Sequence, residues 1–440
     1  MYARRFGAVS ALVICSALLG LLSAQESSAQ QRTGLSWSTD GPVPDSLADL
    51  RNPNYLMRLE QVQALLLELR ERPRDESYVR DVLSGTGVML EDLLALPLIR
   101  RAGELYAPSF PLLTSEDLRY VKEVSERYAR DLAEEYLRHR TEFEEIMGRY
   151  PAEHVPLGRL AFVLLGCFSL DWDGLDITEE LGYRTPFLTE GVGKVHWATE
   201  REPPEAAKAA YRGSHNQTFG DGITLTSFGD HYAPFRFAFP DLVWNLGRAF
   251  PDVMWQAARS YGVEVPQELR PALAAIGRRS LAELGEEVGT LMMALRAGET
   301  SAENIAELTG GGERETEALL SLLEALEYVR LDAGRYATVI PVFSQDDSTM
   351  VQEVLSLGHD LLTGWLEENY EALEADLTRA TPLGDPLPFE DTFYYVWHDV
   401  FGAANRILVE QGMFEDPYGG DRKYAGFVPV VWHRSVNASR

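Results

Sequence analysis

The stretch YAPSFPLLTSED, Tyr106–Asp117, returns 230 positions later as YATVIPVFSQDD, Tyr336–Asp347. Each stretch ends in Thr or Ser followed three residues later by Asp, which is the pattern of a helix-capping box. In that motif the hydroxyl accepts a hydrogen bond from an early backbone N–H, and the acid accepts one from the N–H of the capping residue. Each stretch therefore predicts a short extended segment that ends where a long helix begins.

The repetition extends well beyond these two stretches. Upstream, Glu60–Arg70 resembles Glu286–Arg296 at an offset of 226, so the copies differ by one four-residue length change. That change falls at a glycine turn, Ser84–Gly87 against Thr309–Gly312, where insertions are tolerated. The sequence therefore predicts an internal duplication. Identities at an offset of 230 include Ala95, Leu96, Arg100, Pro111, Asp117, Val121, Glu123, Val124, Leu132, Glu144, Arg149, Pro156, Leu157, Ile177, Glu180 and Gly182.

Each copy reads as helix, short helix, glycine turn, third helix and then two extended runs around a turn. This order resembles a winged helix-turn-helix domain of the MarR or ArsR kind. Such regulators work as homodimers whose long flanking helices pair, so the resemblance implies a pseudo-dimer within one chain. The segments that carry it are Leu59–Leu69, Tyr78–Leu83 and PLIRRAGELYAPSF in the first copy, and Leu284–Leu295, Asn304–Leu308 and EYVRLDAGRYATVIPVF in the second.

The predicted fold is mainly α with small β elements, an α+β class, with two homologous units in a pseudo-twofold arrangement. In each unit a long amphipathic helix and a closing helix follow the hairpin. The closing helices span about 157–181 and 389–411, with Gly182 and Gly412 at their C-terminal caps. The predicted division is a signal peptide at 1–29, a polar linker at 30–49, the first repeat with a glycine- and aromatic-rich insertion at 50–264, and the second repeat with a C-terminal strand at 265–440.

The first thirty residues predict export to the periplasm or the exterior of a bacterium. Arg4 and Arg5 precede the apolar run AVSALVICSALLGLL, and small residues follow, which is the order of a secretory signal. The run is short for a transmembrane helix, so no membrane anchor is expected after cleavage.

The charge of the chain argues against nucleic acid as a partner. Its 440 residues carry a formal charge of −28, whereas phosphate binding needs Lys and Arg. The third helices, which would enter the DNA groove, are acidic: Glu313–Tyr328 has five Glu against one Arg, and Val88–Pro97 has Glu91 and Asp92 with no cation. A transcriptional regulator with a misread N-terminus is retained as an alternative, and a protein-contact or structural module is favoured.

Polar residues gather in the segment that the first copy has and the second lacks. Two glycine-flanked His/Asp clusters there could hold a divalent metal, so a metal-dependent hydrolase is a second alternative. The other interpretation is that His215 and His231 are loop residues bonded to backbone and that Asp221 and Asp230 cap turns, and no cofactor is predicted. The ligand or metal candidates are His196, His215, Asp221, Asp230 and His231, and an aromatic binding platform is suggested by Phe235, Phe237 and Trp244.

The favoured function is an exported, non-catalytic module. It would bind an unidentified protein or small molecule at the cleft between the repeats or in the segment from Val195 to Phe239.

Overall fold

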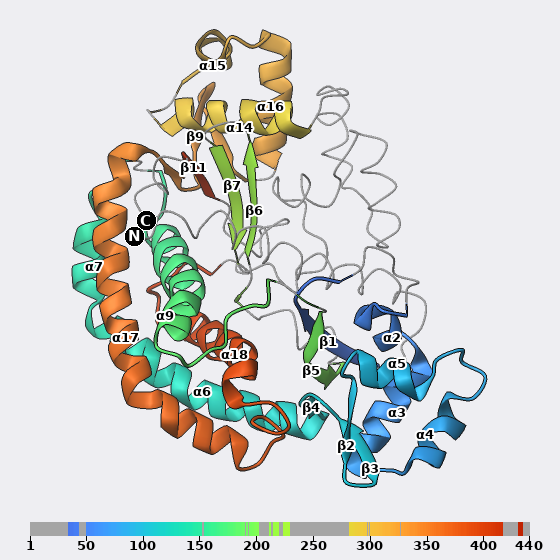
Figure 1. Cartoon of the computed structure of the whole chain (residues 1–440). Helices are drawn as coiled ribbons and strands as arrows, with labels where there is room; N and C mark the ends of the chain where they lie inside the picture. Colours follow the sequence, from blue (N-terminus) through green and yellow to red (C-terminus); the bar gives the residue numbers. More distant parts are fainter. Residues whose placement is uncertain are drawn as a thin grey trace.

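The computed structural model describes residues 34–43, 50–151, 154–189, 191, 193–201, 211–212, 214–219, 223–228, 281–296, 298, 300–325, 327–416 and 430–433. Helices dominate this part of the chain, and its strands form small sheets. The predicted class, mainly α with small β elements, is therefore confirmed. Figure 1 shows the long helices as a curved layer on the left, with one group of short helices and strands at the top and another at the lower right. We call the lower group head 1, the upper group head 2 and the curved layer the helical body.

Head 1 has its own apolar core, in which Leu65, Leu66, Leu93 and Phe110 are buried. Short helices with apolar residues at helical spacing surround this core, and a hairpin lies against the helix of residues 60–71. The elements of head 1 are β1 (Leu35–Asp40), α2 (Pro53–Met57), α3 (Glu60–Glu71), α4 (Glu76–Leu83), α5 (Leu90–Ala95), β2 (Ile99–Ala102), β3 (Leu105–Pro108), β4 (Leu112–Leu113) and β5 (Lys194–Glu200).

Strands that are distant in sequence join in the sheet of head 1. Its order is β1-β5-β4, with β1 antiparallel and β4 parallel to β5. Residues 35–40, predicted to belong to a polar linker, are thus a strand whose Leu35 is fully buried. The sequence LSWSTD is short and polar, and only its pairing with β5 makes it a strand.

Head 2 shares with head 1 a central order of three helices, a two-stranded hairpin and a short strand. Its sheet has the order β10-β11-β7-β6, in which β10 is parallel and β7 antiparallel to β11. Residues 223–228, which the sequence-based division places in the first repeat, therefore bond within the second head. The elements are β6 (Ser214–Phe219), β7 (Ile223–Phe228), α14 (Leu281–Arg296), α15 (Ala302–Thr309), α16 (Glu313–Ala325), β8 (Val329–Asp332), β9 (Arg335–Thr338), β10 (Val342–Phe343) and β11 (Val430–His433).

The hairpins of the two heads have the same register. Arg101 pairs with Tyr106 in head 1, and Leu331 pairs with Tyr336 in head 2, 230 positions later. Each of these tyrosines also bridges to the turn after the first long helix of its head, through Arg74 in one and Thr300 in the other.

The helical body is formed by both halves of the chain together. It consists of α6 (Ser115–Arg138), α7 (Arg140–Met147), α8 (Leu157–Ala161), η2 (Phe162–Asp173) and α9 (Gly174–Glu180) from the first half, and η3 (Gln345–Asp347), α17 (Ser348–Thr378) and α18 (Phe389–Glu410) from the second. The most extensive contact of α6 is with α18, and α17 packs against η2 and also against α6. One apolar core therefore contains residues of both halves.

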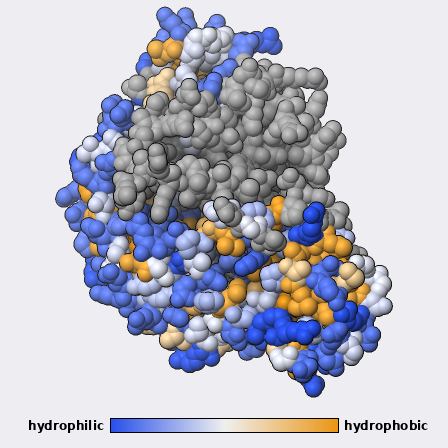
Figure 2. All heavy atoms as spheres, viewed as in Figure 1, coloured by the Kyte–Doolittle hydropathy of each residue, from blue (hydrophilic) through white to orange (hydrophobic). Residues whose placement is uncertain are grey.

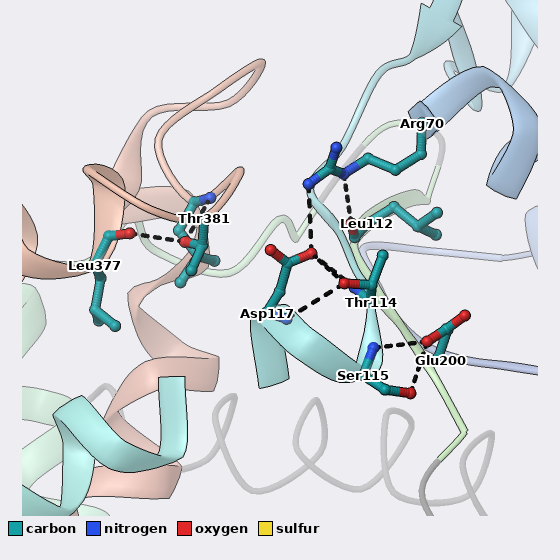
Figure 3. A network of polar contacts seen from close by, with 9 residues as sticks. Arg70, Leu112, Thr114, Ser115, Asp117, Glu200, Leu377 and Thr381 are labelled. Carbon is teal, nitrogen blue, oxygen red and sulfur yellow. Dashed lines mark hydrogen bonds and ion pairs between the residues drawn. The ribbon is translucent and has the colours of Figure 1, made fainter. Parts of the chain in front are cut away.

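Both predicted capping boxes are present. The backbone N–H of Thr114 donates to Asp117 Oδ2 at 2.8 Å, and that of Ser344 donates to Asp347 Oδ2 at 2.7 Å. Figure 3 shows that Arg70 of α3 reaches the first box, where it donates to Asp117 and to the carbonyl of Leu112. The caps at the other helix ends also follow the prediction, since Gly182 and Gly412 have φ of +75° and +67°.

The first closing helix differs from expectation at its centre. Residues 162–173 form a π-helix, η2, where the sequence predicts an α-helix. Side chains of α18 donate to its backbone: Trp397 Nε1 lies 3.0 Å from the carbonyl of Leu170, and Asn405 Nδ2 lies 3.0 Å from that of Gly166. Groups that enter the i→i−4 ladder in this way widen a helix, and they come from the other half of the chain.

The outer surface of the helical body is mostly hydrophilic in the view of Figure 2, while apolar side chains gather on head 1. The charged faces of α6 and α17 therefore point to solvent. No helix among the described residues is both long and apolar enough to cross a bilayer.

Candidate functional site

A depression of about 400 Å³ lies where α9 of the first half ends and α18 of the second half begins. It is therefore a cleft between the two halves, the place at which the sequence suggests binding. Its lining residues are Glu179, Gly182, Arg184, Thr185, Pro186, Pro388, Glu390 and Asp391. We call it the inter-half pocket.

The wall from the first half is fixed by the end of α9. Gly182 adopts the left-handed conformation that stops the helix, and the N–H groups of Tyr183 and Arg184 then both bond to the carbonyl of Thr178. Pro186 follows, so the chain leaves the helix as an extended segment. The opposite wall begins at Pro388, directly before the first turn of α18.

Arg184 is the one cation among the described residues that line the pocket, and its guanidinium is held by an ion pair and by hydrogen bonds. The side chain of Arg184 is 4% exposed and bonds to Glu179 Oε2 at 2.6 Å. Its guanidinium also donates to the carbonyls of Leu175 and Thr185, and it lies 4.7 Å from the centre of the Phe187 ring. Arg184 therefore holds the wall together, and the charge that the pocket presents comes from its carboxylates.

The wall from the second half is acidic. Thr185 Oγ1 donates to Asp391 Oδ1 at 2.5 Å, which ties the two walls together. Partial burial, followed by the charges of Glu390 and Glu371, raises the pKa of Glu374. Burial also raises the pKa of Tyr370, and the charge of Glu390 adds to that effect. The arrangement favours a neutral or positively charged group over an anion.

An aromatic stack supports the floor of this region. The rings of Tyr183 and Tyr370 lie 3.9 Å apart and nearly parallel, and the Tyr370 hydroxyl donates to the Tyr183 carbonyl at 3.3 Å. Because one tyrosine comes from each half, the stack fixes the spacing of the two walls.

His196 is the predicted site residue that lies beside this pocket. Its Nδ1 is 3.1 Å from the carbonyl oxygen of Asp391, and its Nε2 is 3.4 Å from Asp40 Oδ2. Asp40, which is buried, also accepts from the N–H of Leu188 at 2.9 Å. His196 therefore ties β1 and β5 of head 1 to the start of α18.

The structure does not bring His215 into the same sheet as His196. His215 lies in β6 of head 2, whereas His196 lies in β5 of head 1. The other candidates, Asp221, Asp230, His231, Phe235, Phe237 and Trp244, lie outside the described residues. Within the described ranges, no group of three or more His, Cys, Asp or Glu side chains is placed to hold a metal ion.

Sequence reasoning missed most of the pocket. Arg184, Thr185 and Asp391 carry no motif, and the helix caps at Gly182 and Pro388 were the available signals. A scan against protein-family models finds no match, and searches of curated proteins and of solved structures find none either. The functional assignment therefore depends on the residues and geometry of this chain.

Proposed function

We propose that this chain is an exported, non-catalytic binding protein built from two copies of a winged-helix module. The two copies form a pseudo-dimer and bind an unidentified small molecule or protein at the inter-half pocket. The observation that carries the proposal is the reciprocal packing of the halves, because it creates a pocket to which both contribute.

In each half of the chain, an arginine of the hairpin contacts a residue of the opposite half. Arg100 of β2 lies 3.4 Å from Asp385, in the loop before α18. Arg330 of β8 lies 2.9 Å from His154, in the loop before α8. Arg100 and Arg330 are 230 positions apart, and so are Asp385 and Val155, the neighbour of His154. Each hairpin thus rests on the other half, as expected for a dimer whose subunits were joined in one chain.

A second matched pair of contacts joins each head to its long helix. Arg70 donates to the Leu112 carbonyl and to Asp117, and Arg296 donates to the Val342 carbonyl and to Asp347. The offsets are 226 for the arginines and 230 for their partners, as in the sequence repeat. Residues at equivalent positions therefore make equivalent hydrogen bonds in the two units, which supports a duplicated module.

The same contacts weaken the transcription-factor alternative. In a winged-helix DNA-binding protein the hairpin and third helix face the phosphates. Here the hairpin arginines Arg100 and Arg330 face residues of the opposite half. The third helices begin with Glu91 and Asp92 in α5 and with Glu313 and Glu315 in α16. A protein or uncharged or cationic small-molecule partner suits these surfaces better than nucleic acid does.

Thermal-shift measurements on the exported chain, residues 30–440, test the binding function. The probes are spermidine, the amino acids, simple sugars and dipeptides. Glu390→Arg changes the acidic wall of the pocket, and Glu368→Arg adds the same charge on the exposed face of α17. A probe bound in the pocket should stabilise the wild type and the Glu368→Arg protein, and its affinity for Glu390→Arg should fall at least about tenfold.

Two outcomes would contradict the proposal. If a probe stabilises all three proteins equally, it does not bind at the inter-half pocket. If the purified chain contains a stoichiometric divalent metal and hydrolyses a substrate in a metal-dependent way, the hydrolase alternative replaces this proposal. Cell fractionation separately tests export, because a cytoplasmic location would support the regulator.

A further inference from the structure

His359 of α17 faces an acidic surface contributed by the other half of the chain. Its Nδ1 lies 3.1 Å from Oδ2 of Asp173, the last residue of η2. The two side chains are 41% and 15% exposed, so water screens the pair only in part. Because α17 packs against both η2 and α9, this ion pair lies directly on the boundary between the halves.

The backbone next to His359 is held tightly against η2. A Cβ added at Gly358 would lie 2.4 Å from Ser169 Oγ, so only glycine permits the observed approach. Tyr136 Oη lies 2.9 Å from Ser169 Oγ and donates to the Gly358 carbonyl at 3.4 Å. The imidazole is therefore positioned over the end of η2 by close packing and by hydrogen bonds.

Among the described residues, the charged groups that act most strongly on His359 are acidic. They are Asp173 from η2, Glu180 from α9 and Asp360 from α17 itself. Asp176 of α9 stands next to Asp173, and Arg184, in the loop after α9, is the cation that acts on Asp176. From α6 the titratable group in this region is the buried phenol of Tyr136.

We propose that the contact of α17 with η2 and α9 is an acid-strengthened latch between the two halves. At low pH the imidazolium of His359 holds Asp173, and at higher pH its neutral form leaves acidic side chains of both halves facing one another. This inference does not depend on the proposed binding function.

The loss of a proton from His359, and to a smaller extent from Asp176, weakens the contact between the halves as the pH rises. The hydrogen bond with Asp173 raises the pKa of His359 above its ordinary 6.5, so this stabilisation is complete below 6.5 and is lost as the pH rises through the raised pKa. Asp176 is exposed at the surface of α9; partial desolvation, followed by the charge of Asp173, raises its pKa from 3.8 to about 6. Because water screens this exposed group, its ionisation adds only a weak repulsion near the contact as the pH rises.

Hydrogen exchange of the exported chain at pH 5.5 and pH 8.5, corrected for intrinsic exchange rates, tests the latch. Peptides covering α9 and the middle of α17 should be less protected at pH 8.5 than at pH 5.5 in the wild type. His359→Gln keeps a hydrogen-bonding group without the charge, and it should lower the protection at pH 5.5 towards the wild-type value at pH 8.5. Asp173→Asn removes the partner of the imidazolium, and it should likewise lower the protection of α9 at pH 5.5 towards the wild-type value at pH 8.5.

His139→Gln is the matched control, because His139 contacts Glu135 and Glu142 within one half. It should leave the exchange of α9 and α17 unchanged at both pH values. The latch is refuted if the corrected protection of α9 in the wild type is the same at both pH values, or if His359→Gln keeps the full wild-type pH dependence. Should His359→Gln fail to fold, Asp173→Asn still decides, because a full wild-type pH dependence in that variant contradicts the proposal.

Discussion

Replacing Asp171 by Asn should stabilise the protein in alkaline solution. Asp171 lies within the π-helix η2 and is 5% exposed. Burial raises the pKa of its carboxyl group from 3.8 to about 7, against the opposing effect of the Arg212 charge. The guanidinium of Arg212 is already paired with Asp399 at 2.6 Å. Among the described residues, no donor is seen within hydrogen-bond reach of the Asp171 carboxylate, so its charge is stabilised by Arg212 only at a distance.

The size of the effect follows from the raised pKa. A carboxyl group whose folded pKa exceeds its unfolded value destabilises the fold increasingly as the pH rises from 3.8 to about 7, and by a constant amount above that. The full penalty is about 4 kcal/mol, from a difference of about 3 pKa units at ~1.4 kcal/mol each. Because pH 5 is only about one unit above the unfolded pKa of 3.8, the penalty there is about 1–2 kcal/mol.

Urea unfolding of the wild type and of Asp171→Asn at pH 5 and pH 8.5 measures this directly. The difference in unfolding free energy between the two proteins should grow by about 3 kcal/mol between these pH values, in favour of the variant. Glu368→Gln, on the exposed face of α17, should show no such growth. The reasoning is refuted if the difference stays constant, or if Asp171→Asn is less stable than the wild type at pH 8.5, because the carboxylate would then be a favourable partner of Arg212.

The other predictions concern the packing of the two units. Gly358→Ala should destabilise the protein by about 1–3 kcal/mol because its Cβ would meet Ser169, whereas Gly364→Ala, with open space in the same helix, should be stabilising by about 0.5–1 kcal/mol. Urea unfolding measures both, and equal effects would contradict the close approach of α17 to η2. Arg296→Met should lower the unfolding free energy by about 3 kcal/mol, since it breaks a pair whose side chains are 14% and 4% exposed. Arg70→Met should lower the unfolding free energy less than Arg296→Met does, because the Arg70 side chain is 33% exposed. If Arg70→Met lowered it more, the difference in burial between the two ion pairs would not control their contribution to stability.

The sequence by itself determined several local structures along the chain. The capping boxes at Thr114 and Ser344 and the helix ends at Gly182 and Gly412 were predicted and are present. These features depend on residues within a few positions of one another, so their chemistry can be read from the chain alone. The sequence also indicated a cleft between the halves and named His196, which lies beside the inter-half pocket.

Only the tertiary structure decided how the two halves combine. Carbonyls of the π-helix accept hydrogen bonds from Trp397 and Asn405, which lie more than 200 positions away along the chain. The strand β1 exists through its pairing with β5, and His196 acquired its partners Asp40 and Asp391 from two other segments. The burial of apolar side chains favours the packing of an amphipathic helix against an apolar surface, but it does not specify which apolar surface of the chain is used. The choice of surface, α18 for α6 and η2 for α17, was made by the shapes and hydrogen-bonding groups that meet in the folded chain.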